Sequence, residues 1–176
     1  MPFTPLHLGP GLTIKALAGR RFSILSFGIA QVAMDIEPLL GLVRGSSVLH
    51  GPTHTYLAAL AMAIVVAIAS PPLCRLILRR WHQELVFHRL GWLVESETLA
   101  PLAVIAGALV GTISHVLLDS IMHSDISPLA PWSEANALLG LISLQALHQV
   151  CILAGLLGVV GWFFLAWRKQ RTGVSL

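Results

Sequence analysis

A histidine and an aspartate four residues apart, near the end of a long apolar segment, are the residues of this sequence best suited to chemistry. They are His115 and Asp119, in the stretch Ser114-His115-Val116-Leu117-Leu118-Asp119. In a helix, residues i and i+4 lie on one face, about 40° apart. Imidazole and carboxylate groups on one face are ligands that a divalent metal ion accepts. The spacing therefore predicts a metal site at this end of the helix.

Further histidines and carboxylates fall near the ends of other apolar segments. His7 comes early in the chain, Asp35 and Glu37 end the second segment, and His50 and His54 precede the third. A Gly-Pro pair between the last two predicts a tight turn that could direct both rings toward one place. We expect the metal ligands to be His7, Asp35, His50, His54, His115 and Asp119.

The two acidic residues Asp35 and Glu37 are the candidate catalytic groups. Asp35 could ligate or bridge metal ions, whereas Glu37 could orient a ligand or take a proton. His123 lies two turns beyond His115, roughly 12 Å along a helix axis, so these two residues are not expected to share one ion. A second metal ion or a supporting role stays open for His123 and Asp125.

The composition is typical of an integral membrane protein. Of the 176 residues, 56% are hydrophobic and 11% are charged, and the mean hydropathy is +0.81. A soluble domain carries about 25% charged residues. We therefore expect a single all-α domain over residues 1–176, a polytopic bundle of transmembrane helices. The basic residues form no run of the kind that binds nucleic acid, and Cys74 and Cys151 have no metal-binding or disulfide spacing.

Five apolar segments can be drawn, and four of them are long enough to cross a membrane as helices. Segment 5–19 is short, with about 15 residues where a span needs about 20, and could be a fifth crossing or a half-helix. The stretch 79–96 is predicted as an amphipathic helix at the membrane interface. The four full spans are 22–43, 56–78, 97–122 and 138–167.

Basic side chains indicate the orientation of these spans. If the spans cross alternately, nine Lys and Arg residues share one side, which the positive-inside rule makes cytoplasmic. The C-terminus is then cytoplasmic, and the His and Asp residues lie at the outer ends of their helices. The nine are Arg20, Arg21, Arg75, Arg79, Arg80, Arg89, Arg168, Lys169 and Arg171.

These ligands favour metal-dependent hydrolysis of a phosphoester or lipid-linked substrate at the outer membrane surface. A bound ion with an open position would lower the pKa of its water to about 7 and polarise the oxygen under attack. We expect zinc, with manganese or iron as alternatives. The runner-up is a non-catalytic membrane protein in which a metal or polar cluster joins helix ends, indicated by a closed four-ligand site. An ion or proton transporter would need polar groups continuing toward the cytoplasm.

The same residues resemble a known family, the YdjM-like proteins of bacterial inner membranes. Those proteins carry an early His, a Pro-Asp-Ile-Asp element, a His-Arg-Gly-x-Thr-His-Ser element and a Ser-His-x-x-Leu-Asp element. The family is described as LexA-binding or LexA-regulated metal-dependent hydrolases, and is distantly similar to zinc-dependent phospholipase C. In this chain the matching elements are His7, Asp35-Ile36-Glu37, His50 with Thr53-His54-Thr55, and Ser114-His115 with Leu118-Asp119.

The chain departs from the family pattern at three points. Met34 stands where the family has Pro, and Glu37 stands where it has Asp. The interval from His50 to His54 is one residue shorter, and the Arg within it is missing. The resemblance implies a metal-dependent hydrolase in a bacterial inner membrane, but it does not supply a substrate.

Overall fold

The computed structural model describes residues 5–94 and 99–172, and every regular element in these ranges is helical. The predicted all-α class is therefore confirmed. The described ranges also contain four short 3-10 turns, of which η1 (Pro5–His7) precedes the first α-helix and η2 (Gly19–Arg21), η3 (Pro52–His54) and η4 (Gly91–Leu93) lie between later helices. The α-helices are α1 (Leu8–Ala18), α2 (Ile24–Met34), α3 (Ile36–Arg44), α4 (Tyr56–Phe87), α5 (Pro101–Met122) and α6 (Leu144–Thr172).

Four helical stretches are long and apolar enough to cross a membrane, as the sequence predicted. The outer faces of these helices are apolar too: on α6, Leu157 is 69% exposed and Val160 is 65% exposed. Such faces are suited to contact with lipid chains. The four stretches are Ile24–Arg44, Tyr56–Phe87, Pro101–Met122 and Leu144–Arg171, and the short α1 precedes them.

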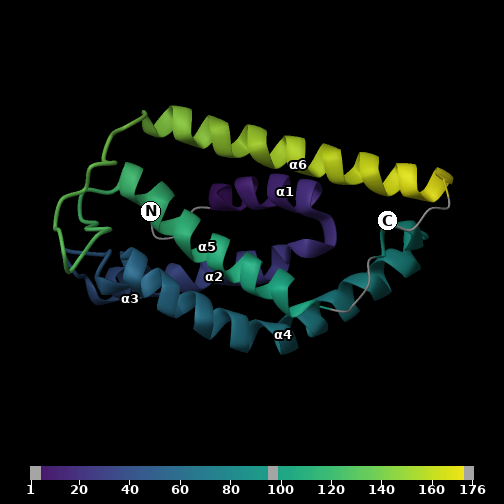
Figure 1. Ribbon diagram of the computed structural model, residues 1–176, viewed down its shortest axis with the longest axis horizontal. Helices are drawn as coiled ribbons and strands as arrows, with labels where there is room; N and C mark the ends of the chain where they lie inside the picture. The colour runs from purple at the N-terminus through teal and green to yellow at the C-terminus, as the bar shows by residue number, and fades with distance from the viewer. Residues whose placement is uncertain (1–4, 95–98, 173–176) are drawn as a thin grey trace.

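Two helix boundaries differ from the predicted segments. Helix α4 passes through Pro71 and Pro72 and ends only at Phe87, so the first half of the expected interfacial stretch 79–96 continues the same helix. It curves around one end of the bundle (Figure 1), as prolines inside a helix allow. The last two residues of that stretch, and the start of segment 97–122, lie outside the described residues. Helix α6 begins after Ser143, whose hydroxyl accepts the Ala146 N–H and caps the helix.

The second predicted segment, 22–43, is divided at Asp35 into α2 and α3. The cause lies in Pro38, which has no N–H and whose ring conflicts with the carbonyl of the residue four positions earlier. That residue is Met34, the last of α2. The break leaves Asp35 at the junction, facing His115 of α5.

Helix α5 packs against both α2 and α4, while α1 packs against α6 and α2 (Figure 1). Glycines make the contact between α2 and α5 close. A Cβ added at Gly107 would overlap the Ser23 carbonyl, and one at Gly111 would lie 2.6 Å from the Ala30 Cβ. Lipid does not drive helices together, so close contact between small residues is a main source of their association.

Helices α1 and α6 meet in the same way. A Cβ added at Gly9 would overlap the Cys151 carbonyl, and one at Gly158 would overlap the backbone of α1 at Leu12. This contact fixes α1 along its length, and therefore the position of His7 just before it.

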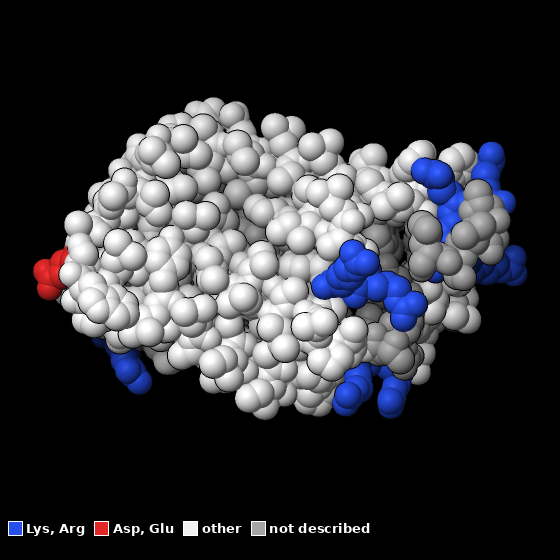
Figure 2. Space-filling view, viewed as in Figure 1, with Lys and Arg blue, Asp and Glu red and all other residues white. Residues whose placement is uncertain are grey.

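The charged residues are distributed unevenly along the bundle. Figure 2 shows one face of the molecule, on which the Lys and Arg side chains gather mainly at the end where α6 finishes. The basic residues of η2, Arg20 and Arg21, and those of the last turn of α6, Lys169 and Arg171, belong to this end. The end of α5 that carries Asp119 points the opposite way (Figure 1). Apart from Arg44, which ends α3 near the loop that carries His50 and His54, the structure thus separates most basic residues from the His and Asp residues.

The contact between α1 and α6 can be tested with two glycines of one helix. Gly158→Ala should lower the free energy of unfolding by about 1–3 kcal/mol, because the new Cβ overpacks against the α1 backbone. Gly161→Ala is the matched control, since its Cβ would have the Ala16 Cβ as nearest neighbour at 3.5 Å. It should preserve stability or raise it by up to about 1 kcal/mol. Thermal unfolding in detergent micelles, followed by circular dichroism, measures the stability of both variants. Equal Tm values for Gly158→Ala and Gly161→Ala would contradict the close packing of α6 against α1.

Candidate metal centre

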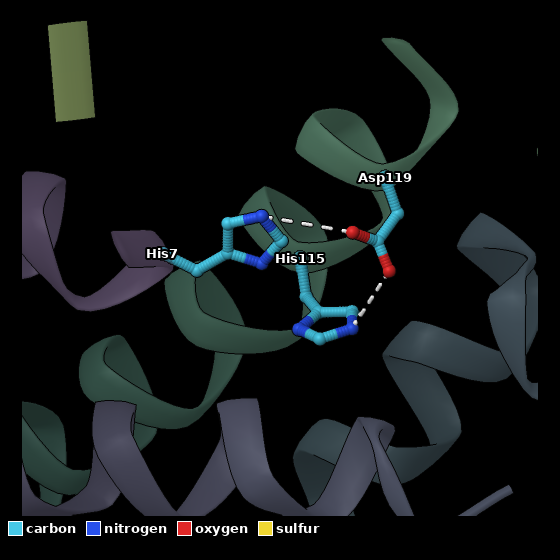
Figure 3. Close-up of side chains that lie close together, drawn as sticks. All are labelled: His7, His115 and Asp119. Carbon is cyan, nitrogen blue, oxygen red and sulfur yellow. Dashed lines mark ion pairs between the residues drawn. The ribbon is translucent and has the colours of Figure 1, made fainter. Parts of the chain in front are cut away.

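The carboxylate of Asp119 lies at the centre of a buried group of histidines. His7, from η1, places its Nε2 3.6 Å from Asp119 Oδ1. His115, from the preceding turn of α5, places its Nε2 3.1 Å from Asp119 Oδ2. Figure 3 shows the two rings approaching different oxygens of the same carboxylate. The helical i, i+4 pair predicted from the sequence therefore does share one face.

The other predicted ligands reach the same place. The Nε2 atoms of His54 and His50 lie 3.5 and 4.0 Å from Asp119 Oδ2. Asp35 Oδ1 lies 3.6 Å from His115 Nε2. All six residues predicted as ligands thus meet in one cluster, which we call the His/Asp cluster: His7, Asp35, His50, His54, His115 and Asp119.

The spacing within the His/Asp cluster suits a divalent metal ion. In a tetrahedral zinc site with bonds of about 2.0–2.1 Å, neighbouring ligand atoms lie about 3.3–3.4 Å apart. Among the described residues, two sets of three within this cluster have ligand atoms within 4.8 Å of one another: His7, His115 and Asp119, and His50, His54 and Asp119; a third set, His50, His123 and Asp125, lies beside it. The two sets within the cluster share Asp119, so the cluster could hold one ion, or two ions bridged by this carboxylate.

Unpartnered nitrogens provide an independent test of this fit. Within the described residues, His7 Nδ1 and Nε2, His54 Nε2 and His115 Nε2 are buried and have no hydrogen-bond partner. Leaving a buried polar atom unsatisfied costs about 1–3 kcal/mol. A metal ion would accept the lone pairs of such nitrogens. The donor set therefore fits a divalent metal.

Gln31 of α2 holds the ring of His115 in the orientation that a ligand needs. Its side-chain NH2 donates to the Gly111 carbonyl at 3.0 Å and to the Ser114 hydroxyl at 3.2 Å. Its Oε1 is therefore free to accept from His115 Nδ1, which lies 2.7 Å away. With the proton on Nδ1, the Nε2 lone pair faces the cluster, as in metal sites where a second residue orients the histidine.

Thr53 and Glu37 hold the ring of His54 in a similar way. The Glu37 carboxylate accepts from the Thr53 N–H at 3.1 Å and from the Thr53 hydroxyl. The hydroxyl oxygen is then available to accept from His54 Nδ1 at 3.1 Å. A Cβ at Gly51 would overlap the Glu37 carboxylate, so a larger residue there would require the Glu37 side chain to move. Of the two roles left open for Glu37, orienting a ligand agrees with its place behind His54.

Asp125 supports His50. Its Oδ1 lies 2.9 Å from His50 Nδ1, and its Oδ2 accepts the N–H groups of Leu49 and His50 at 3.0 and 3.1 Å. Burial raises the pKa of Asp125, but these hydrogen bonds outweigh it and bring the pKa to about 2. Burial also lowers the pKa of His50, against the effect of Asp125, so the imidazole is neutral at pH 7. His123 stacks on His50 with ring centroids 4.2 Å apart.

The loop before α4 brings His50 and His54 to the cluster. Pro52 begins η3, and the Thr55 hydroxyl accepts the Ala58 N–H at 3.1 Å as the cap of α4. The Tyr56 N–H donates to the Pro128 carbonyl at 2.9 Å, which ties this loop to the chain that follows α5.

Gln31 is the residue that sequence reasoning missed. It is the single amide side chain of segment 22–43 and stands one helical turn before Asp35. That i, i+4 relation to a candidate ligand was the available signal. The role of Asp125 had no such local signal, because its partner His50 lies 75 residues away in the chain.

The fold and the site define a multi-pass helical membrane protein with a buried His/Asp cluster that could bind a metal ion. The chain belongs to the YdjM inner membrane protein family, whose family model matches residues 7–175. This match confirms the family resemblance carried by the short motifs. No curated protein and no solved structure matches the chain. The expected similarity to phospholipase C stays a prediction.

Loss of the residues behind the histidines should weaken metal binding while all six residues of the His/Asp cluster remain in place. Gln31→Ala and Asp125→Ala should each lower metal affinity by about 10- to 100-fold, since His115 and His50 lose the hydrogen bonds that orient them. Competition with a chelator of known affinity measures the change. Gln83→Ala, at an exposed position of α4, is the control and should bind as the wild type does. Unchanged affinity in both test variants would contradict an orienting role.

Proposed function

We propose that this protein is a metal-dependent hydrolase of a phosphoester or lipid-linked substrate, with its site at the outer face of a bacterial inner membrane. The observation that carries the proposal is the convergence of four imidazole Nε2 atoms on the buried Asp119 carboxylate. Three of these rings have their Nδ1 atoms held by partners outside the cluster, at Gln31, Thr53 and Asp125. This arrangement directs several lone pairs to one point.

The donor set favours zinc, with manganese and iron as alternatives, because neutral imidazoles and carboxylates suit these ions. His7, His115 and Asp119, or His50, His54 and Asp119, would hold the ion and leave a position open. When bound, such an ion lowers the pKa of its water to about 7 and polarises the oxygen under attack.

Asp35 is the cluster residue that a substrate could reach most easily. Its side chain is 13% exposed, compared with 5% for Asp119 and 1% for His115. In the proposed reaction, the free carboxylate oxygen of Asp35 accepts a proton or completes the ligand set. Glu37 is a positioning residue, because it acts on His54 through Thr53.

The second candidate function is a structural metal centre that fastens helix ends together. The observation that favours it is burial, since His54 and His115 are 0% exposed. A structural site has four protein ligands and no open position, whereas a catalytic site keeps one open. Both candidate functions therefore predict a bound metal ion, but only the hydrolase predicts catalytic activity.

The deciding experiment combines metal content with hydrolysis. The wild type should carry stoichiometric zinc, manganese or iron by elemental mass spectrometry and should cleave phosphoester substrates. His115→Ala and Asp119→Ala should lose the metal and fall to background activity, because each removes a central ligand. His88→Ala is the control; this histidine has an exposed side chain and pairs with Glu84 on α4.

The possible results separate the candidates. Absence of metal from the wild type after reconstitution would overturn both. Metal that is lost in the two variants, with no turnover of any phosphoester, would favour the structural centre over the hydrolase.

The orientation is part of the same proposal, with the basic end and the C-terminus cytoplasmic by the positive-inside rule. A cysteine at Ser47, between α3 and η3, should be labelled in intact cells by a membrane-impermeant thiol reagent. A cysteine at Gln83, near the end of α4, should be labelled only after lysis; both positions are exposed. The native Cys74 and Cys151 are buried, so the unmodified protein provides the background. The reverse pattern would invert the topology and remove the external site.

A further inference from the structure

An apolar groove of about 610 Å³ runs along α2, within the range typical of ligand pockets. Helix α1 contributes Leu8 and Leu12 to its walls, and α4 contributes Leu73 and Ile77. In the described part of the chain, Gln31 and Asp35 are the sole polar residues that line it. The groove therefore has one polar end and an apolar body.

The dimensions of the groove match one leaflet of a membrane. From Ile24 to Asp35, α2 rises about 16 Å, which is roughly half of the 30 Å hydrocarbon core of a bilayer. Both residues line the groove, and α2 belongs to the stretch Ile24–Arg44, which is long and apolar enough to span a membrane. The groove consequently faces hydrocarbon chains and is about as long as one leaflet is deep.

The polar end of the groove is part of the His/Asp cluster. Asp35 Oδ1 lies 3.6 Å from His115 Nε2, and Gln31 Oε1 lies 2.7 Å from His115 Nδ1. Both side chains thus belong to the groove wall and to the surroundings of the proposed metal ligand. A molecule lying in the groove would have its polar end at the cluster.

We propose that this groove binds the hydrocarbon chain of a phospholipid and presents its phosphate to the His/Asp cluster, so that the substrate enters sideways from the bilayer. The inference rests on the proposed function and names its substrate class. Apart from Asp35, the described lining carries no charge, so the charged part of the lipid has its place at the Asp35 end. A divalent ion held there by the His/Asp cluster would neutralise phosphate charge beside the Asp35 carboxylate, which would favour a phospholipid over an uncharged lipid.

Gly28 offers a way to fill the groove without disturbing the helices. It lies in the groove floor, and a Cβ added there would have one neighbour within 4 Å, Leu8 Cδ2 at 3.8 Å. Gly28→Phe therefore places a ring in the groove without overlapping the backbone. Val32→Phe is a second blocking variant, because Val32 lines the groove and is 51% exposed. Ala61→Phe, at an exposed position of α4 outside the groove lining, is the matched control.

Native mass spectrometry of the zinc-loaded full chain, released from detergent, measures lipid and metal together. With the non-hydrolysable phosphonate analogue of dioleoyl phosphatidic acid as the phosphatidic acid probe, the wild type and Ala61→Phe should retain one lipid. Gly28→Phe and Val32→Phe should lower lipid occupancy by roughly tenfold or more. Dioleoylglycerol, which lacks the phosphate, should bind the wild type roughly tenfold more weakly. Glycerol 3-phosphate at the same concentration should not displace the phosphatidic acid.

Three results would overturn the proposal: equal lipid occupancy in the two blocking variants and Ala61→Phe, equal binding of dioleoylglycerol, or displacement by glycerol 3-phosphate. Displacement by glycerol 3-phosphate would mean that the protein binds the headgroup alone and not the hydrocarbon chain. If Gly28→Phe loses metal as well as lipid, that substitution has disturbed the His/Asp cluster. The lipid occupancy of Val32→Phe then tests the groove in its place. A wild type that keeps phosphatidic acid and binds no metal would support the groove and overturn the hydrolase, so the two failures are distinguishable.

Discussion

The buried charge of Asp119 is the constraint on which the rest of this structure depends. Its side chain is 5% exposed near the end of an apolar helix, where an unpaired carboxylate would cost several kcal/mol. The residues that face it come from η1, from the loop before α4 and from α5 itself. Because these segments are far apart in the chain, surrounding Asp119 requires the start of α1, the start of α4 and the end of α5 to meet.

Close helix packing determines where those segments meet. Gly107 and Gly111 let α5 approach the backbone of α2, and the same contact allows Gln31 to bond both the Gly111 carbonyl and the His115 ring. One helix contact therefore stabilises the bundle and orients a candidate ligand. Substituting these glycines would affect the site as well as the fold, since their close approach is the means by which α2 and α5 bring Asp35 and His115 together.

The break at Asp35 connects the polar and apolar parts of the molecule. Pro38 ends α2 at Met34, and Asp35 then lies between the His/Asp cluster and the groove along α2. The basic residues lie mainly at the opposite end (Figure 2). In its described residues, this member of the YdjM inner membrane protein family thus has a polar cluster, an apolar groove that reaches it and an opposite end that carries most of the basic residues. This arrangement is what supports a lipid substrate for the proposed hydrolase.

The sequence by itself determined the helical membrane class, the four spans and the six residues of the His/Asp cluster. Hydropathy over about 20 residues and the i, i+4 spacing of His115 and Asp119 are local properties, so they can be read without a fold. The tertiary structure decided that Asp119 is the centre, that Gln31 and Asp125 hold histidines, and that Glu37 stands behind His54. Gln31 and His115 are 84 residues apart, and His50 and Asp125 are 75 apart. Contacts at such separations depend on how the helices pack, which no local pattern specifies.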